Sequence, residues 1–168
     1  DSFILATAHR AENVDNPAVL RNLVEAYLEA PLPIVYPVHP RAKKRLIQNG
    51  LWRKLKNSRN VQLLPPVGYF DFLMLMKNCR FIVTDSGGIQ EEATAPPIRK
   101  QVIVTRISTE RPEAVKAGFA NVVGTKRENI ISAMKEALEN DKNLPYNSPF
   151  GDGKAAEKIV NTLRKELS

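Results

Sequence analysis

The chain has 168 residues, of which 43% are hydrophobic and 26% are charged, a composition typical of one globular domain with its own core. It contains no apolar stretch long enough to span a bilayer, and its N-terminus lacks the basic and apolar regions of a signal peptide. We therefore expect a cytoplasmic protein without a membrane partner. The single cysteine, Cys79, cannot form an internal disulfide and is predicted to be a buried, unreactive thiol.

The net charge of +7 comes from one part of the chain. Residues 39–60 carry eight basic side chains and no acidic one, which leaves 17 basic residues against 18 acidic residues elsewhere. Many of these basic residues lie in a predicted helix whose apolar positions turn inward, which is typical of a solvated face. Nucleic-acid binding is the alternative, but only Trp52 could stack on a base there, and no groove-reading motif is present. We predict no nucleic-acid partner.

Short apolar runs alternate with helical patterns along the chain. The apolar runs predict six strands, at residues 3–8, 34–38, 61–64, 81–84, 102–105 and 121–123. Helical periodicity and capping residues predict helices at about 17–28, 41–48, 51–55, 69–76, 88–93, 112–116 and 130–138. A polar link at 140–153 precedes a final predicted helix at 155–167. Because Asp1 and Ser2 lead at once into the first strand with no initiator Met, we expect a fragment of a longer protein.

This alternation implies right-handed crossovers and a parallel sheet covered on both faces, so the predicted fold class is α/β, doubly wound and Rossmann-like. In the common strand order 3-2-1-4-5-6, ligands bind beyond the carboxyl ends of the first and fourth strands. Polar segments follow these two strands, at residues 7–13 and 84–93, and the fifth strand is followed by another at 106–112. We expect a binding site where the three segments meet.

The segment after the fourth strand reads Thr84-Asp85-Ser86-Gly87-Gly88-Ile89-Gln90-Glu91-Glu92-Ala93. Glycines allow close backbone approach, and the free N–H groups of a new helix favour an anion, which indicates a seat for phosphate. A carboxylate one turn further can accept hydrogen bonds from ribose hydroxyls, so a nucleotide would explain both features. The alternative is that Ser86 is an N-cap, the glycines form a tight turn, and the acids complement the helix dipole.

Other side chains at this edge have a binding interpretation and a structural one. His9 is a candidate acid, base or phosphate donor, or else a capping or packing residue. Arg10 and Arg111 are candidates for bidentate bonds to a diphosphate, while ion pairs with Glu12 or Glu110 are the alternative. On the helix that follows the third strand, Tyr69 and Phe72 could stack on a base, and core packing is the alternative for Phe72.

Six short motifs occur in order along the chain. They are Thr-x-His-Arg-x-Glu-Asn at 7–13, Pro-Val-His-Pro at 37–40, Tyr-x-x-Phe at 69–72, Thr-Asp-Ser-Gly-Gly-Ile-Gln-Glu-Glu-Ala at 84–93, Thr-Glu-Arg-Pro-Glu at 109–113 and Pro-Phe-Gly-Asp-Gly at 149–153. Together they resemble the C-terminal half of the non-hydrolysing UDP-N-acetylglucosamine 2-epimerases. Complete members of that family have two Rossmann-like domains facing a cleft, as in GT-B glycosyltransferases.

The resemblance implies a domain organisation and a reaction. Residues 1–168 would be the UDP-binding domain, the N-terminal domain with the catalytic carboxylates would be absent, and the terminal helix at 154–168 would pack toward it. The complete enzyme would interconvert UDP-GlcNAc and UDP-ManNAc by eliminating UDP to give 2-acetamidoglucal and adding UDP back on the other face. It would need no cofactor and no metal, and it would be a cytoplasmic homodimer. We expect the isolated chain to be inactive.

The resemblance also implies roles for individual residues. The diphosphate would be held by Ser86, Gly87 and Gly88 together with Arg111, while Arg10 is a candidate for UDP binding from its position alone. Glu92 would bind the ribose, Phe72 would lie in the uridine pocket, and His9 would act at the leaving diphosphate. In some bacterial members the equivalents of Arg10 and His39 contact a second, activating UDP-GlcNAc.

The chain departs from the family pattern in two places. Val67 stands where some members have a glutamine near the uridine. Residues 93–101 read Ala-Thr-Ala-Pro-Pro-Ile-Arg-Lys-Gln, which is longer than the usual turn. Two other functions are compatible with the same residues: a UDP-sugar glycosyltransferase of GT-B type, and a nucleotide-sugar-binding domain without catalysis.

Overall fold

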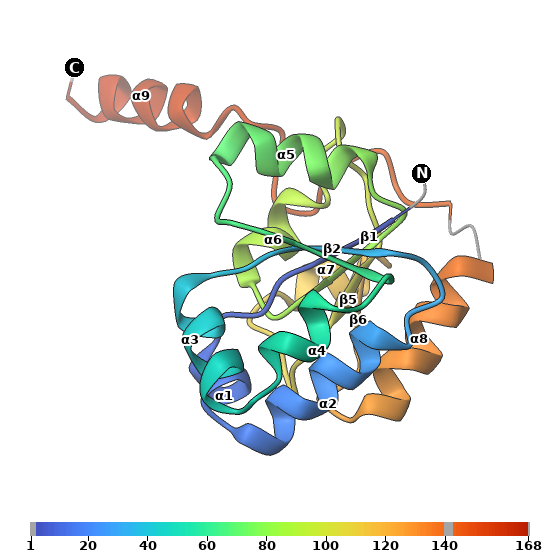
Figure 1. Ribbon diagram of the computed structural model, residues 1–168. Coiled ribbons are helices and arrows are strands. Elements are labelled where there is room, and N and C mark those ends of the chain that lie inside the picture. Colours follow the sequence, from blue (N-terminus) through green and yellow to red (C-terminus); the bar gives the residue numbers. More distant parts are fainter. Residues whose placement is uncertain (1–2, 140–142, 168) are drawn as a thin grey trace.

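A computed structural model describes residues 3–139 and 143–167 (Figure 1). The start of the predicted link at 140–142 and the two chain ends lie outside these residues. The six strands are short and all parallel: β1 (Ile4–Ala6), β2 (Ile34–Pro37), β3 (Val61–Leu64), β4 (Ile82–Thr84), β5 (Val102–Val104) and β6 (Ala120–Val122). They lie in the order β3-β2-β1-β4-β5-β6, which confirms the predicted topology.

Helices cover both faces of this sheet (Figure 1). They are α1 (Ala11–Val14), α2 (Pro17–Leu28), α3 (Pro40–Gln48), α4 (Trp52–Lys56), α5 (Tyr69–Asn78), α6 (Gly87–Glu92), α7 (Pro112–Lys116), α8 (Arg127–Glu139) and α9 (Ala155–Glu166). The alternation of side chains along β1 divides the core into two layers. Ile4 and Ala6 pack with residues of α2, α3, α4 and α8, whereas Leu5 packs with residues of α5 and α7.

One short helix was not predicted. Residues 11–14 form the single turn α1 directly after β1, and Arg10 stands at its N-cap position without a side-chain capping bond. The sequence lacks the usual signal for the start of a helix here, because the N-cap position directly before the turn is not Ser, Thr, Asp or Asn. The predicted apolar face of α5 is also only partly correct, since Met76 is buried but Tyr69 is exposed.

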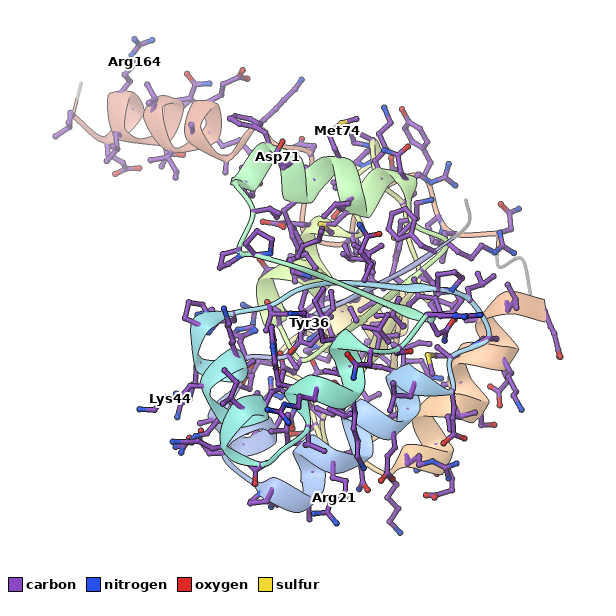
Figure 2. All side chains as sticks on the ribbon, in the orientation of Figure 1. Arg21, Tyr36, Lys44, Asp71, Met74 and Arg164 are labelled. Carbon is purple, nitrogen blue, oxygen red and sulfur yellow. The ribbon has the colours of Figure 1, made fainter. Side chains whose placement is uncertain are left out.

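Two further observations concern burial. Cys79 is fully buried, and burial raises the pKa of its thiol to about 12, which confirms the predicted unreactive thiol. The helix α9 stands away from the sheet, beyond α5, with the labelled Arg164 pointing outward (Figures 1 and 2), and its apolar side chains Ile159, Val160 and Leu163 are exposed. Among the described helices, none combines the length and the hydrophobicity that a bilayer crossing requires.

A pair of buried tyrosines supports the strand that leads into the polar edge. Tyr36 of β2 lies in the interior (Figure 2) and donates a hydrogen bond from its hydroxyl to the carbonyl oxygen of Ala8, at 3.3 Å. Its ring meets that of Tyr27 edge to face, with the ring centroids 5.6 Å apart. The Tyr27 hydroxyl is equally buried but finds no hydrogen-bond partner among the described residues.

Removal of the two hydroxyls should therefore have different effects on the free energy of unfolding. Tyr36→Phe leaves the buried carbonyl of Ala8 without this donor and should lower the free energy of unfolding by about 1 kcal/mol. Tyr27→Phe removes a buried hydroxyl that lacks a partner and should leave stability unchanged or raise it by up to about 1 kcal/mol. Urea unfolding of the two variants against the parent chain measures both effects. Equal destabilisation by the two substitutions would contradict this assignment of hydrogen bonds.

Candidate functional site

The carboxyl ends of β1 and β4 are joined by one buried carboxylate. Asp85 follows β4 and is completely buried. It accepts hydrogen bonds from the backbone N–H groups of His9 and Arg10, both at 3.0 Å, and from the side-chain amide of Asn13 at 3.1 Å. The Nδ1 atom of the His9 imidazole lies 3.1 Å from Oδ1 of the same carboxylate. The segment after β1 is thus folded over the end of β4.

The charge of this carboxylate follows from its surroundings. Burial alone would raise the pKa of Asp85, but the hydrogen bonds from the His9 side chain and from the backbone of His9 and Arg10 outweigh burial. The pKa of the carboxyl therefore lies below its ordinary value. Asp85 is ionised at neutral pH and acts only as an acceptor.

The start of α6 is held in place by local hydrogen bonds. The Thr84 hydroxyl lies 2.6 Å from that of Thr7 on the neighbouring strand, and it accepts from the backbone N–H of Ser86 at 3.0 Å. The Ser86 hydroxyl accepts from the N–H of Ile89, so Ser86 is an N-cap as the structural alternative proposed. Capping uses one N–H group of the first turn and leaves the glycine N–H groups for a ligand.

Two arginines converge on the first residue of α6. A Cβ atom added to Gly87 would lie 3.7 Å from Nη2 of Arg10, 3.7 Å from Cζ of Arg111 and 3.6 Å from Oε2 of Glu110. The backbone at Gly87 thus forms the floor of a small concave space with two guanidinium groups on its wall. Cations, helical N–H groups and an approachable backbone together form a site suited to an anion such as a diphosphate.

In this structure the arginines are paired with carboxylates. Arg10 contacts Glu110 at 3.2 Å, Arg111 forms an ion pair with Glu91, and the nearly buried Arg106 binds Glu110 and Glu12. The ion-pair alternative for Arg10 is therefore realised with Glu110. Because Arg10, Arg111 and their partners are partly exposed, these pairs are weak and leave the guanidinium groups available for exchange with a ligand.

The segment after β5 is tied to α6 through two polar side chains. The Thr109 hydroxyl donates to Oε1 of Gln90 at 2.6 Å and accepts from the backbone N–H of Arg111 at 3.1 Å. The buried Gln90 donates in turn to the carbonyl of Ser86 at 3.1 Å. Arg111 is therefore positioned relative to the glycines by a continuous set of hydrogen bonds.

A cleft of about 390 Å³ opens beside His9 at the same edge of the sheet. Its wall combines residues from five segments: Thr7, Ala8, His9, Pro37, His39, Pro66, Val67, Phe72 and Ile89. The rings of His9 and His39 are close, with centroids 5.8 Å apart. Phe72 packs against the core and also lines this cleft, so core packing is confirmed, whereas contact with a base stays a prediction.

Glu92 lies apart from that cleft. It is half-buried in a separate hollow of about 260 Å³ between α5 and the loop that follows α6, where it meets Tyr69. Burial raises the pKa of the Glu92 carboxyl, and a hydrogen bond from Tyr69 acts in the opposite direction. The structure thus brings His9, His39 and Phe72 into one cleft. It places Arg10 and Arg111 beside the glycines. Glu92 belongs to neither group and lies about one turn of α6 beyond the glycines.

The long loop at 93–101 has a structural contact of its own. The Thr94 hydroxyl lies 2.6 Å from that of Ser148, and Nε of Arg99 donates to the carbonyl of Pro145 at 3.2 Å. Arg99 adopts a positive φ of 44°, which is uncommon for a side chain of its size. The extra residues therefore fasten the segment that leads to α9.

Several positioning residues were missed by sequence reasoning: Asn13, Asp85, Gln90, Thr109 and Arg106. A usable signal was present for Asp85, because a carboxylate directly after a buried strand needs hydrogen-bond partners wherever the strand end is covered. Among residues 3–139 and 143–167, no group of three or more His, Cys, Asp or Glu side chains is placed to hold a metal ion. The chemistry that the edge offers is anion binding beside an imidazole that is held by a carboxylate.

Comparison with known proteins agrees with this description. A family model described as UDP-N-acetylglucosamine 2-epimerase matches residues 1–164. The UDP-N-acetylglucosamine 2-epimerase of Methanocaldococcus jannaschii is 44% identical over 167 residues, which cover 97% of this chain and 44% of the relative. That of Bacillus subtilis is 37% identical over 172 residues, with 97% and 43% covered. The chain therefore spans less than half the length of these curated relatives.

Solved structures give the same result. The M. jannaschii UDP-GlcNAc 2-epimerase in complex with UDP-GlcNAc and UDP superposes with a TM-score of 0.87 at 43% identity, covering 98% of this chain and 45% of that one. A Staphylococcus aureus MnaA–UDP co-structure gives 0.80 at 39% identity, with 99% and 46% covered. An Escherichia coli heptosyltransferase, WaaC with ADP, shares the fold alone, at 14% identity and a TM-score of 0.53 over 82% of this chain and 43% of that one. With a family model matched over nearly all its residues, this chain belongs to the UDP-N-acetylglucosamine 2-epimerase family.

Proposed function

We propose that this chain is the UDP-binding half of an enzyme that interconverts UDP-GlcNAc and UDP-ManNAc. The observation that carries the proposal is the convergence of Arg10 and Arg111 on the glycine at the start of α6. Two solved structures support the identity of the anion as the diphosphate of a UDP-sugar: the M. jannaschii UDP-GlcNAc 2-epimerase in complex with UDP-GlcNAc and UDP, and the S. aureus MnaA–UDP co-structure.

In this proposal the diphosphate lies against Gly87 and Gly88 and receives N–H groups from the first turn of α6. Arg10 and Arg111 leave their carboxylate partners and bind the phosphate oxygens, since a diphosphate carries more charge than one carboxylate. Glu110 stays paired with Arg106, which has two carboxylate partners and is nearly buried. In this proposal the hydroxyl of Ser86, which caps α6, also donates a hydrogen bond to a phosphate oxygen.

The nucleoside would extend along α5. Phe72 provides an aromatic wall beside the cleft, and Glu92 accepts hydrogen bonds from the ribose hydroxyls after Tyr69 yields its contact. Val67 offers only apolar contact on the cleft wall, so uracil would be recognised there by backbone groups and shape. His9 lines the cleft and is followed directly by Arg10, and in this proposal it acts on the departing phosphate oxygen.

The proposed reaction removes a proton from C2 of the sugar and breaks the bond between C1 and the diphosphate oxygen. This chain supplies the groups that stabilise the departing diphosphate, and the base at C2 belongs to the other half of the enzyme. The terminal helix α9 presents an exposed apolar stripe that would pack toward that half. Contacts of Arg10 and His39 with a second UDP-GlcNAc, a homodimer and a cytoplasmic location stay predictions.

Two other functions use the same groups. A UDP-sugar glycosyltransferase of GT-B type would also need a diphosphate seat and a ribose carboxylate, but among the solved relatives WaaC resembles this chain in fold only. A binding domain without catalysis would keep every contact proposed above.

The diphosphate seat can be tested at Gly87. Its φ is not positive, and an added Cβ would make only ordinary contacts at 3.6–3.7 Å, so larger residues should fold. Gly87→Ala should weaken UDP binding by about 1–2 kcal/mol, because the methyl group keeps the phosphate from the backbone N–H groups. Gly87→Leu should abolish it by filling the space between the guanidinium groups. Calorimetric titration with UDP measures the series, and thermal unfolding serves as the folding control. An unchanged affinity in the leucine variant would rule out this seat.

The ribose contact can be tested by comparing two adjacent acids. Glu92→Gln should weaken UDP binding by about 1.5–3 kcal/mol, the range for hydrogen bonds to a charged acceptor. Glu91→Gln is the matched control: it removes the same charge but releases Arg111 from its ion pair, so UDP binding should stay equal or become tighter. Losses of the same size in both variants would show that Glu92 has no specific role.

The division between binding and chemistry gives a further prediction. The chain should bind UDP, because the proposed diphosphate contacts lie within it, but it should not epimerise UDP-GlcNAc without a base held at C2. We would incubate it with UDP-GlcNAc in D2O and follow deuterium at C2 by NMR, beside the full-length M. jannaschii epimerase as a positive control. Deuterium incorporation by the chain alone would place the base within these 168 residues and contradict the proposed division.

A further inference from the structure

We propose that Asp85 is the positioning residue of His9: it holds the hydrogen of the imidazole on Nδ1 and leaves Nε2 as the ring nitrogen that meets the diphosphate. The proposal extends the proposed function, and its consequence for UDP binding rests on that function. The placement of the hydrogen on Nδ1 depends only on the geometry of the two side chains.

The argument starts from the donors around Asp85. Its carboxylate is inaccessible to solvent and has two oxygens, which receive the N–H of His9, the N–H of Arg10 and the amide of Asn13. A carboxylate that receives only donors has no hydrogen to give. The imidazole Nδ1 lies 3.1 Å from Oδ1, a hydrogen-bond distance, so this nitrogen must be the one that carries the hydrogen.

The second histidine is bonded in the opposite sense. Nδ1 of His39 accepts from the backbone N–H of Arg41 at 3.2 Å, at the start of α3. A nitrogen that accepts carries no hydrogen, so the hydrogen of a neutral His39 ring lies on Nε2. The chain contains only these two histidines. The structure therefore assigns opposite tautomers to two rings whose centroids are 5.8 Å apart, and each ring serves as a reference for the other.

The consequence for a ligand concerns Nε2 of His9. In the neutral ring this nitrogen has a lone pair, which repels a phosphate oxygen. In the protonated ring both nitrogens donate, one to Asp85 and one to the ligand, and the adjacent carboxylate stabilises the positive charge. During elimination the electron pair of the bond from C1 moves to the diphosphate oxygen, and the Nε2–H group donates a hydrogen bond to that oxygen. The C2 proton goes to the base of the other half.

Other charged groups around His9 are few. The cleft wall contributes His39 from the segment after β2, and Phe72 of α5 and Val67 carry no charge. The adjacent Arg10 points toward Glu110 and the glycines. Among the described residues that line this cleft, His39 is therefore the other imidazole, and a test of His9 must account for it.

The first measurement needs no substitution. Long-range ¹H–¹⁵N NMR of the imidazoles in the unaltered chain, in alkaline buffer where both rings are neutral, reports which nitrogen carries the hydrogen, and His39→Gln assigns the two rings. We expect one ring with the hydrogen on Nδ1, belonging to His9, and one with it on Nε2, belonging to His39. A His9 ring with the hydrogen on Nε2 would overturn the proposal whether or not the chain binds UDP.

Asp85→Asn tests the cause. The amide oxygen of the new side chain would face the three donors, and its NH2 group would face Nδ1 of His9, so the hydrogen should move to Nε2. Asp15→Asn is the matched control, because it removes an equal charge from a carboxylate paired with Arg41 and Arg45. Folding is checked by thermal unfolding. An unchanged His9 tautomer in a folded Asp85→Asn chain would overturn the proposal. If the variant does not fold, the NMR measurement on the unaltered chain decides.

UDP binding against pH gives the functional readout. The affinity of the parent chain for UDP should be about tenfold or more lower in alkaline buffer than in acidic buffer, because the neutral ring of His9 has lost the Nε2–H donor. In Asp85→Asn the decline should be much smaller, because a neutral ring keeps a hydrogen on Nε2. Both comparisons are made in the His39→Gln background. Parallel declines in the two chains would overturn the role toward the diphosphate, whereas no UDP binding at any pH would count against the proposed function and not against the assigned tautomer.

Discussion

The polar edge of this protein depends on a buried negative charge between the two middle strands. Removing a carboxylate from water costs several kcal/mol unless donors replace the lost hydration. Asp85 meets this requirement with two backbone N–H groups, one side-chain amide and one imidazole, all contributed by the segment after β1. That segment must therefore turn over the end of β4, which explains why it forms the uncapped turn α1. The position of His9 and Arg10 is thus a consequence of satisfying Asp85.

The arginines at the same edge bind their carboxylate partners more weakly than they would bind a diphosphate. Arg10 and Arg111 are held beside Gly87 by exposed carboxylates, which fix the orientation of the guanidinium groups at little cost. Arg106 differs because it is nearly buried. Its hydrogen bonds to Glu110 and, to a smaller extent, to Glu12 raise its pKa, so it stays charged and keeps its ion pairs. A ligand that takes Arg10 from Glu110 therefore leaves no carboxylate unpaired, since Glu110 keeps Arg106. The network can exchange one bond without disturbing the loop.

Much of the architecture could be predicted from the sequence. Short apolar runs separated by helical periods are sufficient to specify a doubly wound parallel sheet, and the strand order then determines which loops meet. Residues with special backbone or charge requirements, such as Gly87, Arg10 and Arg111, could be placed for the same reason. The partners of these residues could not be predicted. Asn13 bonds to Asp85 across 72 positions of sequence, and Thr109 bonds to Gln90 across 19, and no local pattern encodes such pairings.

The two expected departures from the family pattern lie outside the proposed diphosphate seat, and this separation has a physical reason. The seat is built from three loops that constrain one another through Asp85, Gln90 and Thr109, so an inserted residue there would break several buried hydrogen bonds at once. Val67 lies on an open cleft wall, and the long loop at 93–101 contacts the segment before α9 through Thr94 and Arg99. Changes at these places would alter the surroundings of the proposed nucleoside site and the attachment of the C-terminal segment. They would leave unchanged the groups proposed to face the diphosphate, so variation within the fold would affect the cleft wall at Val67 and the path to α9 before it affected the proposed anion site.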